Sequence, residues 1–492
     1  MQNTLGRKGF TVGIILLFVG TCIIPSFAQN LEKTSLPTSR GNWLYVGGSG
    51  PGNYTKIQDA INDSSNGTTV FVFNGTYYEN IVIDKIITLK GENKNTTIID
   101  GTNSNYSLIT IKANGIYIGG FTIRNSSPYY WGIFFELDCD GVSIIDNIIK
   151  NNRGAILVAR SHNTNISRNI IIDNYCNNSG GAIILSNSSD NIIYGNVIIN
   201  FTGDYGDSIS LSSHSCNNEV YGNTINKSDV GISVGFSSNY NKIFSNSISN
   251  CEYCGIEVSG TSYNEVYSNT ISNNKYGIHA GWYFSYNNIH GNTISNNLIG
   301  IKVEPTENSS DNIFYHNNFL NNTQFNAYVY DKYIHKWDNG YPSGGNYWDD
   351  YTGEDIFSGP NQNLTGSDGI GDTPYLIPGA DDQDRYPLME PYERTELAIG
   401  LISGGLFRIK AEIKNIGWYN ATDINWTIEV IGRFWSGEIP IIEPGDSEII
   451  STGFLLGLGR AQITVTAKAS NAEKVTETRD GFIFLFFIII RE

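Results

Sequence analysis

The sequence predicts an all-β protein: a right-handed parallel β-helix, which is a solenoid of three sheets, followed by a small immunoglobulin-like β-sandwich. An eight-residue unit rich in Asn and Ile recurs every 22–27 residues through the middle of the chain. Residues that favour turns and strands abound, with 59 Asn, 53 Gly and 30 Tyr among 492 residues. From residue 395 the repeat gives way to longer alternating strands.

The N-terminus carries the three parts of a secretory signal peptide over residues 1–28. Arg7 and Lys8 precede an apolar run at 10–24, and Ser26-Phe27-Ala28 has the form of a cleavage site. An uncleaved anchor helix is the alternative. We therefore expect an exported protein that is secreted, extracellular or on the cell surface, or periplasmic if the host has an outer membrane. Asn-x-Ser/Thr sequons, which fit a glycoprotein, occur for example at Asn53, Asn74 and Asn165.

The charge of the chain excludes one class of partner. Thirty-one Lys and Arg stand against 48 Asp and Glu, so the formal net charge is −17. Proteins that bind nucleic acid through the phosphate backbone need clustered positive charge. We therefore expect no nucleic-acid partner.

The repeat predicts the β-helix over residues 43–330. Residues 264–271 read Asn-Glu-Val-Tyr-Ser-Asn-Thr-Ile, and similar units stand at 241–248 and 218–225. Apolar residues alternate within each unit, which is the period of a strand. A unit of this length cannot bury an apolar face alone, so the units must stack as coils around one core. Leucine-rich repeats would need a Leu ladder, which is absent, and a flat array of hairpins is the remaining alternative.

One Asn recurs at the same place in every regular unit. We expect these side chains to stack as a column, to hydrogen-bond from coil to coil, and to adopt the left-handed bend at each corner. The column comprises Asn196, Asn223, Asn246, Asn269 and Asn292.

Residues 331–394 form an acidic segment rich in Gly, Asp and Pro, with 13 acids against four bases. We expect irregular structure that caps the last coil and links it to the next domain. Asp368, Asp372 and Asp384 are candidate ligands for Ca²⁺, which prefers oxygen ligands. A solvated acidic loop without a cation is the alternative.

Residues 395–492 carry about seven alternating strands separated by turn signals, which is typical of an immunoglobulin-like sandwich. The apolar tail at 482–490 is too short for a membrane helix, which needs about 20 residues. We expect it to form a final buried strand, with a membrane anchor as the alternative.

Four charged residues form a candidate catalytic cluster. Asp138 and Arg160 occupy equivalent places in successive units, and so do Asp140 and His162. Adjacent coils should therefore bring each pair within about 5 Å. Carboxylates beside Arg and His can bind a cation or transfer protons. An exposed ladder of ion pairs is the alternative.

In several coils, aromatic side chains stand at the start of the segment that carries this charged cluster. A ring with one face exposed to water can stack against a sugar. Core filling or stacking at the corners is the alternative. The candidate carbohydrate-binding residues are Trp131, Tyr175, Tyr205, Trp282 and Tyr283.

No copper site is identifiable in the sequence. Copper favours thiolate, thioether or imidazole ligands, but the six His show no regular spacing and Met389 is the one Met after the signal. We expect Cys251 and Cys254 to form a local disulfide or to remain thiols.

The repeating units resemble the NosD family of right-handed parallel β-helix proteins, labelled periplasmic copper-binding, within the pectin-lyase-like superfamily. Residues 53–61 resemble the capping helix of that family, and 345–351 with 368–375 resemble the segments that close archaeal surface members. Residues 414–417 and 443–446 resemble the CARDB-type module of surface proteins.

The resemblance implies the fold strongly and the function weakly. The catalytic motifs of the polygalacturonase and alginate-epimerase types are absent, so an enzyme is less expected than a binder. We expect a surface protein that binds extended carbohydrate along the helix flank and contributes to adhesion, with the C-terminal module attaching to the cell surface or to another envelope protein. A polysaccharide lyase or hydrolase, or a copper-related accessory protein, is the alternative.

Overall fold

The computed structural model describes residues 42–490, apart from 103, 137, 177–179, 204–205, 306–308, 331–332, 393–394, 418–419, 444, 471 and 473. The predicted signal peptide, residues 1–28, lies outside the described residues. Among these residues, none of the helices combines the length and the apolar character needed to cross a membrane.

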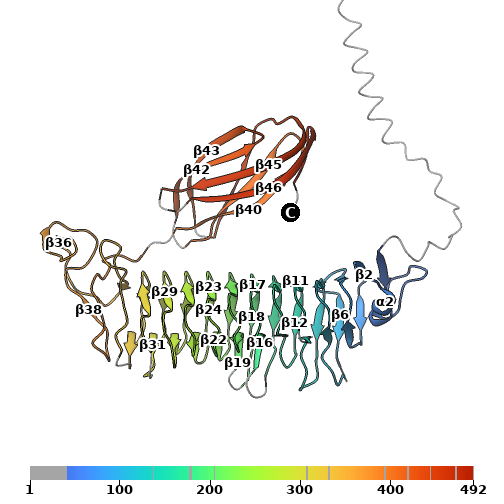
Figure 1. Cartoon of the computed structure of the whole chain (residues 1–492), viewed down its shortest axis with the longest axis horizontal. Coiled ribbons are helices and arrows are strands. Elements are labelled where there is room, and N and C mark those ends of the chain that lie inside the picture. Colours follow the sequence, from blue (N-terminus) through green and yellow to red (C-terminus); the bar gives the residue numbers. More distant parts are fainter. Residues whose placement is uncertain are drawn as a thin grey trace, which may run out of the picture.

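Three parallel sheets form a β-helix, as predicted, and each coil adds one strand to each sheet (Figure 1). Sheet A contains β1 (Trp43–Val46), β2 (Thr68–Val72), β5 (Ile87–Gly91), β8 (Tyr117–Gly119), β11 (Ser143–Ile145), β14 (Asn165–Ser167), β17 (Ile192–Tyr194), β20 (Glu219–Tyr221), β23 (Lys242–Phe244), β26 (Glu265–Tyr267), β29 (Asn288–His290) and β32 (Ile313–Tyr315). Sheet B contains β3 (Gly75–Tyr77), β6 (Thr97–Asp100), β9 (Thr122–Arg124), β12 (Ile148–Lys150), β15 (Ile170–Ile172), β18 (Val197–Ile199), β21 (Thr224–Asn226), β24 (Ser247–Ser249), β27 (Thr270–Ser272), β30 (Thr293–Ser295), β33 (Asn318–Leu320) and β35 (Tyr347–Trp348). Sheet C contains β4 (Ile81–Ile83), β7 (Ile109–Ile111), β10 (Ile133–Phe135), β13 (Ile156–Ala159), β16 (Gly180–Ser186), β19 (Gly206–Ser212), β22 (Val230–Gly235), β25 (Cys254–Ser259), β28 (Tyr276–Ala280), β31 (Ile299–Val303) and β34 (Phe325–Val329).

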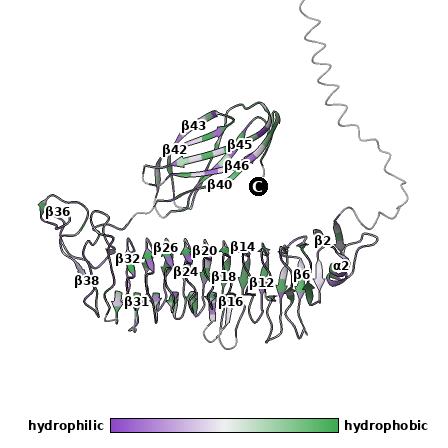
Figure 2. Ribbon diagram, viewed as in Figure 1, coloured by the Kyte–Doolittle hydropathy of each residue, from purple (hydrophilic) through white to green (hydrophobic). Residues whose placement is uncertain are grey.

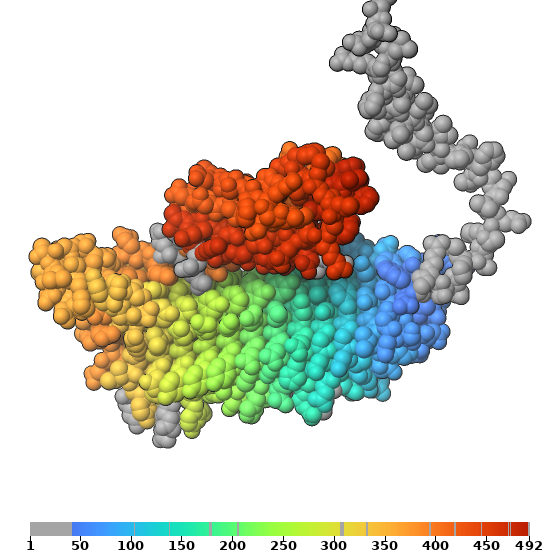
Figure 3. Space-filling view, turned by 45° about the horizontal axis from the view of Figure 1, so that its top comes forward, coloured from blue at the N-terminus to red at the C-terminus, as the bar shows by residue number. Residues whose placement is uncertain are grey.

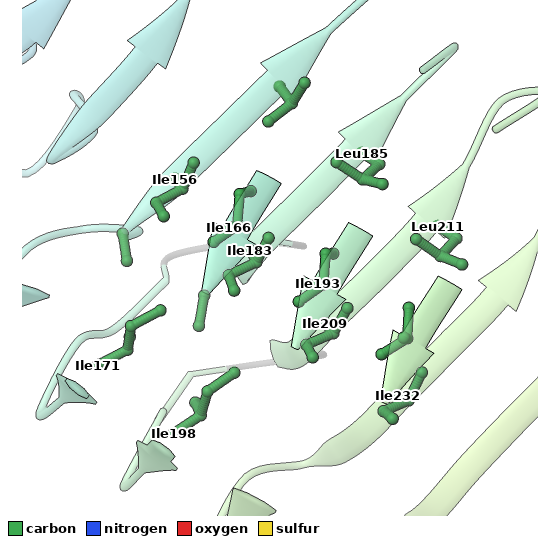
Figure 4. Packing of buried hydrophobic residues seen from close by; sticks show 14 of the residues in the cluster. Ile156, Ile166, Ile171, Ile183, Leu185, Ile193, Ile198, Ile209, Leu211 and Ile232 are labelled. Carbon is green, nitrogen blue, oxygen red and sulfur yellow. The ribbon is translucent and has the colours of Figure 1, made fainter. Parts of the chain in front are cut away.

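Stacked aliphatic side chains fill the interior of the helix. Ile183, Ile209 and Ile232 occupy the same place in successive coils and are fully buried (Figure 4). Hydrophobic residues recur from strand to strand along the helix (Figure 2), because alternate residues of each short strand face inward. Burying one such side chain contributes about 1.5–3 kcal/mol. The space-filling view shows the coils as successive parallel bands (Figure 3).

The predicted Asn column is present and is longer than expected. Asn246 Nδ2 donates to Asn269 Oδ1 at 3.0 Å, and the Asn246 main-chain N–H donates to the same oxygen at 3.0 Å. The same pattern continues to Asn346 at the end of the helix. A second amide column of the same kind runs through Asn191, Asn218, Asn241, Asn264, Asn287 and Asn312.

The expectation that these Asn residues adopt the left-handed bend is wrong. The bend falls on the residue before each one, with φ of 62° at Gly195, 53° at Ser245 and 55° at Ser268. The preceding residue turns the chain, so that the Asn side chain points inward along the column. Buried amides are stable there because their donors and acceptors are paired.

Both ends of the helix are covered. At the N-terminal end, α2 (Ile57–Asp63) buries Ile57 and Ile61, and the Glu79 carboxylate accepts the N–H groups of Ile57 and Gln58 at 2.9 and 3.0 Å. At the C-terminal end, the buried Trp348 stacks on Phe319 with ring centroids 4.3 Å apart. The cap also contains four short strands, β36 (Phe357–Ser358), β37 (Leu364–Thr365), β38 (Tyr375–Leu376) and β39 (Gln383–Asp384).

Two antiparallel sheets share one core in the C-terminal domain, which agrees with the predicted sandwich. One sheet contains β40 (Leu397–Gly404), β41 (Ile409–Asn415) and β44 (Ser447–Ser451). The other contains β42 (Ala421–Val430), β43 (Arg433–Ile442), β45 (Gly457–Lys468), β46 (Val475–Leu485) and β47 (Phe487–Ile490).

The apolar tail at 482–490 is a hairpin rather than one buried strand. The chain turns at Leu485, where φ is 56°, and β46 then pairs with β47. Ile483 and Ile488 face the core, whereas Phe484 is 54% exposed. Strand alternation therefore leaves half of this run on the surface.

Candidate functional site

A groove of about 610 Å³ crosses the outer face of sheet C over its first three strands, β4, β7 and β10. Its floor consists of Val82, Thr110 and Phe134, which are direct neighbours in the strand register. These residues point outward because the residues that flank them point into the core, which are Ile in β4 and β7 and Ile133 and Phe135 in β10. The groove is lined by Asn80, Ile81, Val82, Tyr106, Ser107, Thr110, Lys112, Tyr129, Tyr130, Trp131, Phe134 and Glu136.

Aromatic residues form one wall of the groove, in the turns that lead from sheet B to sheet C. Tyr106 and Tyr129 are 67% and 81% exposed, and Tyr130 lies 6.0 Å from Tyr106 between ring centroids. Trp131 is one of the predicted carbohydrate-binding residues. It lines the groove but is largely buried, and the Arg153 guanidinium lies 5.7 Å from its ring centroid. The free ring faces on this wall therefore belong to the tyrosines.

An ion pair forms the opposite wall, where the chain leaves sheet C. Lys112 Nζ lies 2.6 Å from Glu136 Oε1, and both side chains are more than a third exposed. Such a pair adds little stability in water. It does place one donor group and one acceptor group beside the apolar floor, which is the combination that orients a polar ligand.

The predicted charged cluster lies beyond the Glu136 end of the groove, and the structure brings its members together in pairs. Arg160 Nη2 lies 3.1 Å from Asp138 Oδ2. Asp140 Oδ1 accepts the main-chain N–H of His162 at 2.7 Å, so it contacts the backbone of that residue rather than its ring. The ring Nδ1 of His162 accepts the N–H of Ser189 at 3.1 Å. The predicted one-coil spacing is thus correct, and the expected contact between Asp140 and the imidazole is replaced by a main-chain contact.

The other predicted aromatic residues do not join the groove. Trp282 and Tyr283 are 68% and 58% exposed on the turn after β28, which is six coils, or roughly 29 Å, from β10. Tyr175 is half-buried and bridges to Thr202. Tyr205 lies outside the described residues.

The three predicted calcium ligands accept hydrogen bonds from groups of the cap. Asp372 accepts the N–H groups of Ile356 and Phe357, and Asp368 accepts that of Gly359. Asp384 is fully buried, and burial raises its pKa to about 7, against hydrogen bonds from Trp348 and neighbouring N–H groups that lower it. In the part of the chain that the structure describes, no group of three or more His, Cys, Asp or Glu is placed to hold a metal ion. Calcium binding stays a prediction, and these three carboxylates do not share one site.

Cys251 and Cys254 are free thiols. Burial raises the pKa of Cys251 to about 11 and holds that of Cys254 well above its usual value, so neither side chain is a thiolate at neutral pH. The local disulfide between them, one of two expected outcomes, is not formed.

The structure contains two aromatic ladders that the sequence analysis does not predict. Exposed Tyr240, Tyr263 and Tyr286 stack at 5.1 and 5.2 Å. A half-buried ladder occupies the fourth position of each repeat unit. The aromatic residues at that position are the sequence signal from which this ladder can be predicted. It comprises Tyr194, Tyr221, Phe244, Tyr267, His290 and Tyr315. These rings stack on one another, so few of their faces remain free for a ligand.

The chain is similar to a cell-surface relative and to several solved structures. The chain is 35% identical over 146 residues to a "Cell surface glycoprotein" of Methanothermus fervidus, a match that covers 29% of this chain and 21% of the relative's length. Among solved structures it is similar to the mannuronan C-5 epimerase AlgE4 A-module of Azotobacter vinelandii, with a TM-score of 0.44 and 13% identity over 59% of this chain and 88% of that one. XylC in complex with xylose gives a TM-score of 0.44 and 12% identity over 83% and 100% of the two chains.

The match to a family model covers more of the chain than the match to the cell-surface relative. The model of the family "Periplasmic copper-binding protein (NosD)" matches residues 61–254 and 201–353. Together the two matches cover more than half of the chain, over the coils and the start of the cap. The chain therefore belongs to the NosD family of β-helix proteins.

Proposed function

We propose that this protein is a secreted or cell-surface glycan-binding protein that holds an extended polysaccharide on the outer face of sheet C. The observation that carries the proposal is the groove over β4, β7 and β10, which combines exposed tyrosine rings with the Lys112–Glu136 pair. Sugars bind where an apolar ring face meets directed hydrogen-bonding groups. The cell-surface relative supports the location.

The groove spans three successive coils of the helix. A polymer that lies in it can therefore continue over the neighbouring coils. Repeated weak contacts along one flank give avidity to a long ligand. We assign the C-terminal sandwich, as a CARDB-like module, to attachment at the cell surface, which makes the protein an adhesion factor.

Two alternative functions have less support. A polysaccharide lyase or hydrolase acting through Asp138, Asp140, Arg160 and His162 is supported by the adjacency of the two pairs alone, since the His162 Nδ1 already accepts an N–H group. A copper-related role is supported by the family description alone.

Retention of the chain in gels that contain single polysaccharides tests the proposal. The full chain without residues 1–28 should be slowed by at least one polymer. Tyr106→Ala combined with Tyr129→Ala should weaken retention about 10-fold, because two stacking contacts of roughly 0.5–1.5 kcal/mol each are lost.

Tyr78→Ala is the matched control, because Tyr78 is 69% exposed and lies outside the groove. Equal weakening by Tyr78→Ala, or no retention by any neutral or acidic polysaccharide, would overturn the proposal.

A further inference from the structure

Three connections meet at one end of the C-terminal sandwich. They are residues 405–408 between β40 and β41, residues 452–456 between β44 and β45, and the turn between β46 and β47. Phe407 joins them, because its ring stacks on Phe454 at 4.6 Å and on Phe486 at 5.0 Å between centroids. These connections and the adjoining ends of β45, β46 and β47 form the tip of the sandwich.

Apolar side chains cover the outer face of the five-stranded sheet at the tip. Leu458 is opposite Phe484 in the strand register, and Phe484 is opposite Phe487. Phe482 and Ile489 form a second pair beside them. All five are between 43% and 73% exposed, because strand alternation points them away from the core. The exposed apolar surface continues around the end of the sandwich through Leu406, Phe454, Leu456 and Leu485.

The same face of the sheet is polar away from the tip. Gln462 is opposite Asp480, and Thr464 is opposite Thr478, with the two threonine hydroxyl oxygens 3.2 Å apart. The solvated face of an antiparallel sheet is normally polar in this way. A large exposed apolar patch with a polar border is instead typical of a site that contacts a protein or a membrane. The tip therefore has the composition of a contact surface.

Basic residues border the tip, although the chain as a whole carries a formal net charge of −17. Arg408 directly follows Phe407 and is exposed, and Arg460 is exposed opposite Phe482. Asp480 comes only in the next outward row of β46. The charge beside the apolar surface is therefore positive.

Contacts between the connections fix the shape of the tip. Phe486 stacks on Phe487 at 4.6 Å, and Leu406 forms an antiparallel bridge to Phe487. The Ile488 N–H donates to the Gly405 carbonyl at 3.0 Å. The hairpin of β46 and β47 is thus tied to the other sheet, so binding through the tip costs little ordering of the chain.

An apolar end with a basic border fits a lipid surface. Apolar side chains enter the boundary between the headgroups and the acyl chains, and Arg side chains attract anionic headgroups. The apolar surface wraps around the end of the sandwich, and a bilayer can accommodate such a convex end. A second copy of the chain would have to provide a matching hollow, and its own net negative charge would oppose association.

We propose that the tip inserts into the surface of a lipid bilayer and holds the protein at an anionic membrane. The proposal rests on the assignment of the sandwich to attachment at the cell surface, and it names lipid as the partner. Leu458, Phe484 and Phe487 enter the acyl boundary, whereas Arg408 and Arg460 stay among the headgroups. The glycan-binding groove lies on the β-helix and takes no part.

Co-sedimentation of the full chain without residues 1–28 with lipid vesicles tests the proposal. The probes are vesicles of phosphatidylcholine alone and vesicles that also contain phosphatidylglycerol. We expect binding to both kinds, with tighter binding to the anionic vesicles that weakens as salt is added. Leu458→Thr combined with Phe484→Thr should lower the partition coefficient about 10²-fold, because each of these side chains contributes about tenfold when it is buried.

The sheet can accommodate this double substitution, since Thr464 and Thr478 already form such a pair on the same two strands. Arg408→Gln combined with Arg460→Gln is an independent test. It should weaken binding to anionic vesicles about fivefold per residue and leave binding to neutral vesicles unchanged.

Ile441→Thr is the matched control, because Ile441 is an exposed residue of the same sheet and lies opposite Thr422, at the end away from the tip. This variant should bind vesicles like the natural sequence. Melting temperatures of all variants show whether each one folds.

Two results overturn the proposal: no binding of the natural sequence to either kind of vesicle, or unchanged binding after Leu458→Thr with Phe484→Thr. Light scattering covers the competing occupant. A dimer that this double substitution converts to a monomer, without vesicle binding, would assign the tip to a second copy of the chain. Failure of the glycan-binding function shows separately, as absence of retention in the polysaccharide gels.

Discussion

Arg160 Nη2 lies 3.1 Å from Asp138 Oδ2, although 22 residues separate them in the chain. The contact exists because one coil of the helix takes up that interval, so residues at equivalent places become neighbours. Both side chains are at least half exposed, and their backbones lie in the left-handed region, with φ of 47° and 65°.

Asp138→Asn should change the free energy of unfolding by less than about 1 kcal/mol, because water and salt screen an exposed ion pair. Asn tolerates the left-handed backbone as Asp does, so this substitution isolates the charge. Chemical denaturation at low and high salt measures the effect. A loss above about 2 kcal/mol would show that the pair is part of a tighter network.

Asn246→Ala should destabilise the helix by about 3 kcal/mol or more, because buried groups of neighbouring coils lose their partners. Asn246 donates to Val220 O and Asn269 Oδ1 and accepts from Asn223. Asn226→Ala, which removes one half-buried contact to Ser249, should cost less than about 1.5 kcal/mol. Equal losses in the two variants would contradict a special role for the column.

Tyr263→Ala should cost about 1–3 kcal/mol, because it removes two ring stacks of the exposed ladder at roughly 0.5–1.5 kcal/mol each. Tyr263→Phe keeps both stacks and should leave the melting temperature unchanged. Retention of polysaccharide should survive both changes, since the ring faces are already occupied. Reduced retention in the Tyr263→Ala variant alone would show that the ladder also binds the ligand.

The contact between Asp338 and Arg385 should make the C-terminal cap sensitive to acid. The Asp338 side chain is buried and accepts two hydrogen bonds from the guanidinium at 2.7 and 2.8 Å. Burial alone would raise the pKa of Asp338, but hydrogen bonds from Arg385 and Gly340 hold it below its usual value.

A carboxyl whose pKa is lower in the folded state stabilises the fold above its unfolded pKa, roughly 3.9, and loses this effect as the pH falls through the folded value. Unfolding free energies measured from pH 6 down to pH 2 should therefore fall less steeply in Asp338→Asn. At pH 7 this variant should be less stable by about 1.5–3 kcal/mol, the range for a hydrogen bond to a charged group. An unchanged slope would contradict the assignment.

The fold could be predicted because its determinants repeat. Each Asn of the column occurs at the same place in its unit, and the strand alternation follows from Ile at fixed positions. The sequence predicts the left-handed corners at the wrong residue, because Asn favours that conformation in isolation while the column requires its side chain inside. Gly195 and Ser245 take the bend instead.

The candidate sites were harder to predict, because outward-facing positions carry no repeated signal. Lys112 and Glu136 pair only when strands β7 and β10 are aligned. Glu257 and His279 occupy a position whose residue type differs from one repeat unit to the next. Their proximity is therefore visible only in the register of sheet C. The contact between Asp138 and Arg160 could be predicted, because both residues lie the same number of positions before the start of the next repeat unit.

The amide columns make the coil an interchangeable segment. If residues 242–264 were excised, Asn241 would precede Glu265 and would replace Asn264 in its column, while Asn223 would meet Asn269 in the other. Neither end cap would be touched. The number of coils is therefore free to change by gene duplication or deletion in steps of about 4.8 Å, so that the length of sheet C can change without redesigning the core.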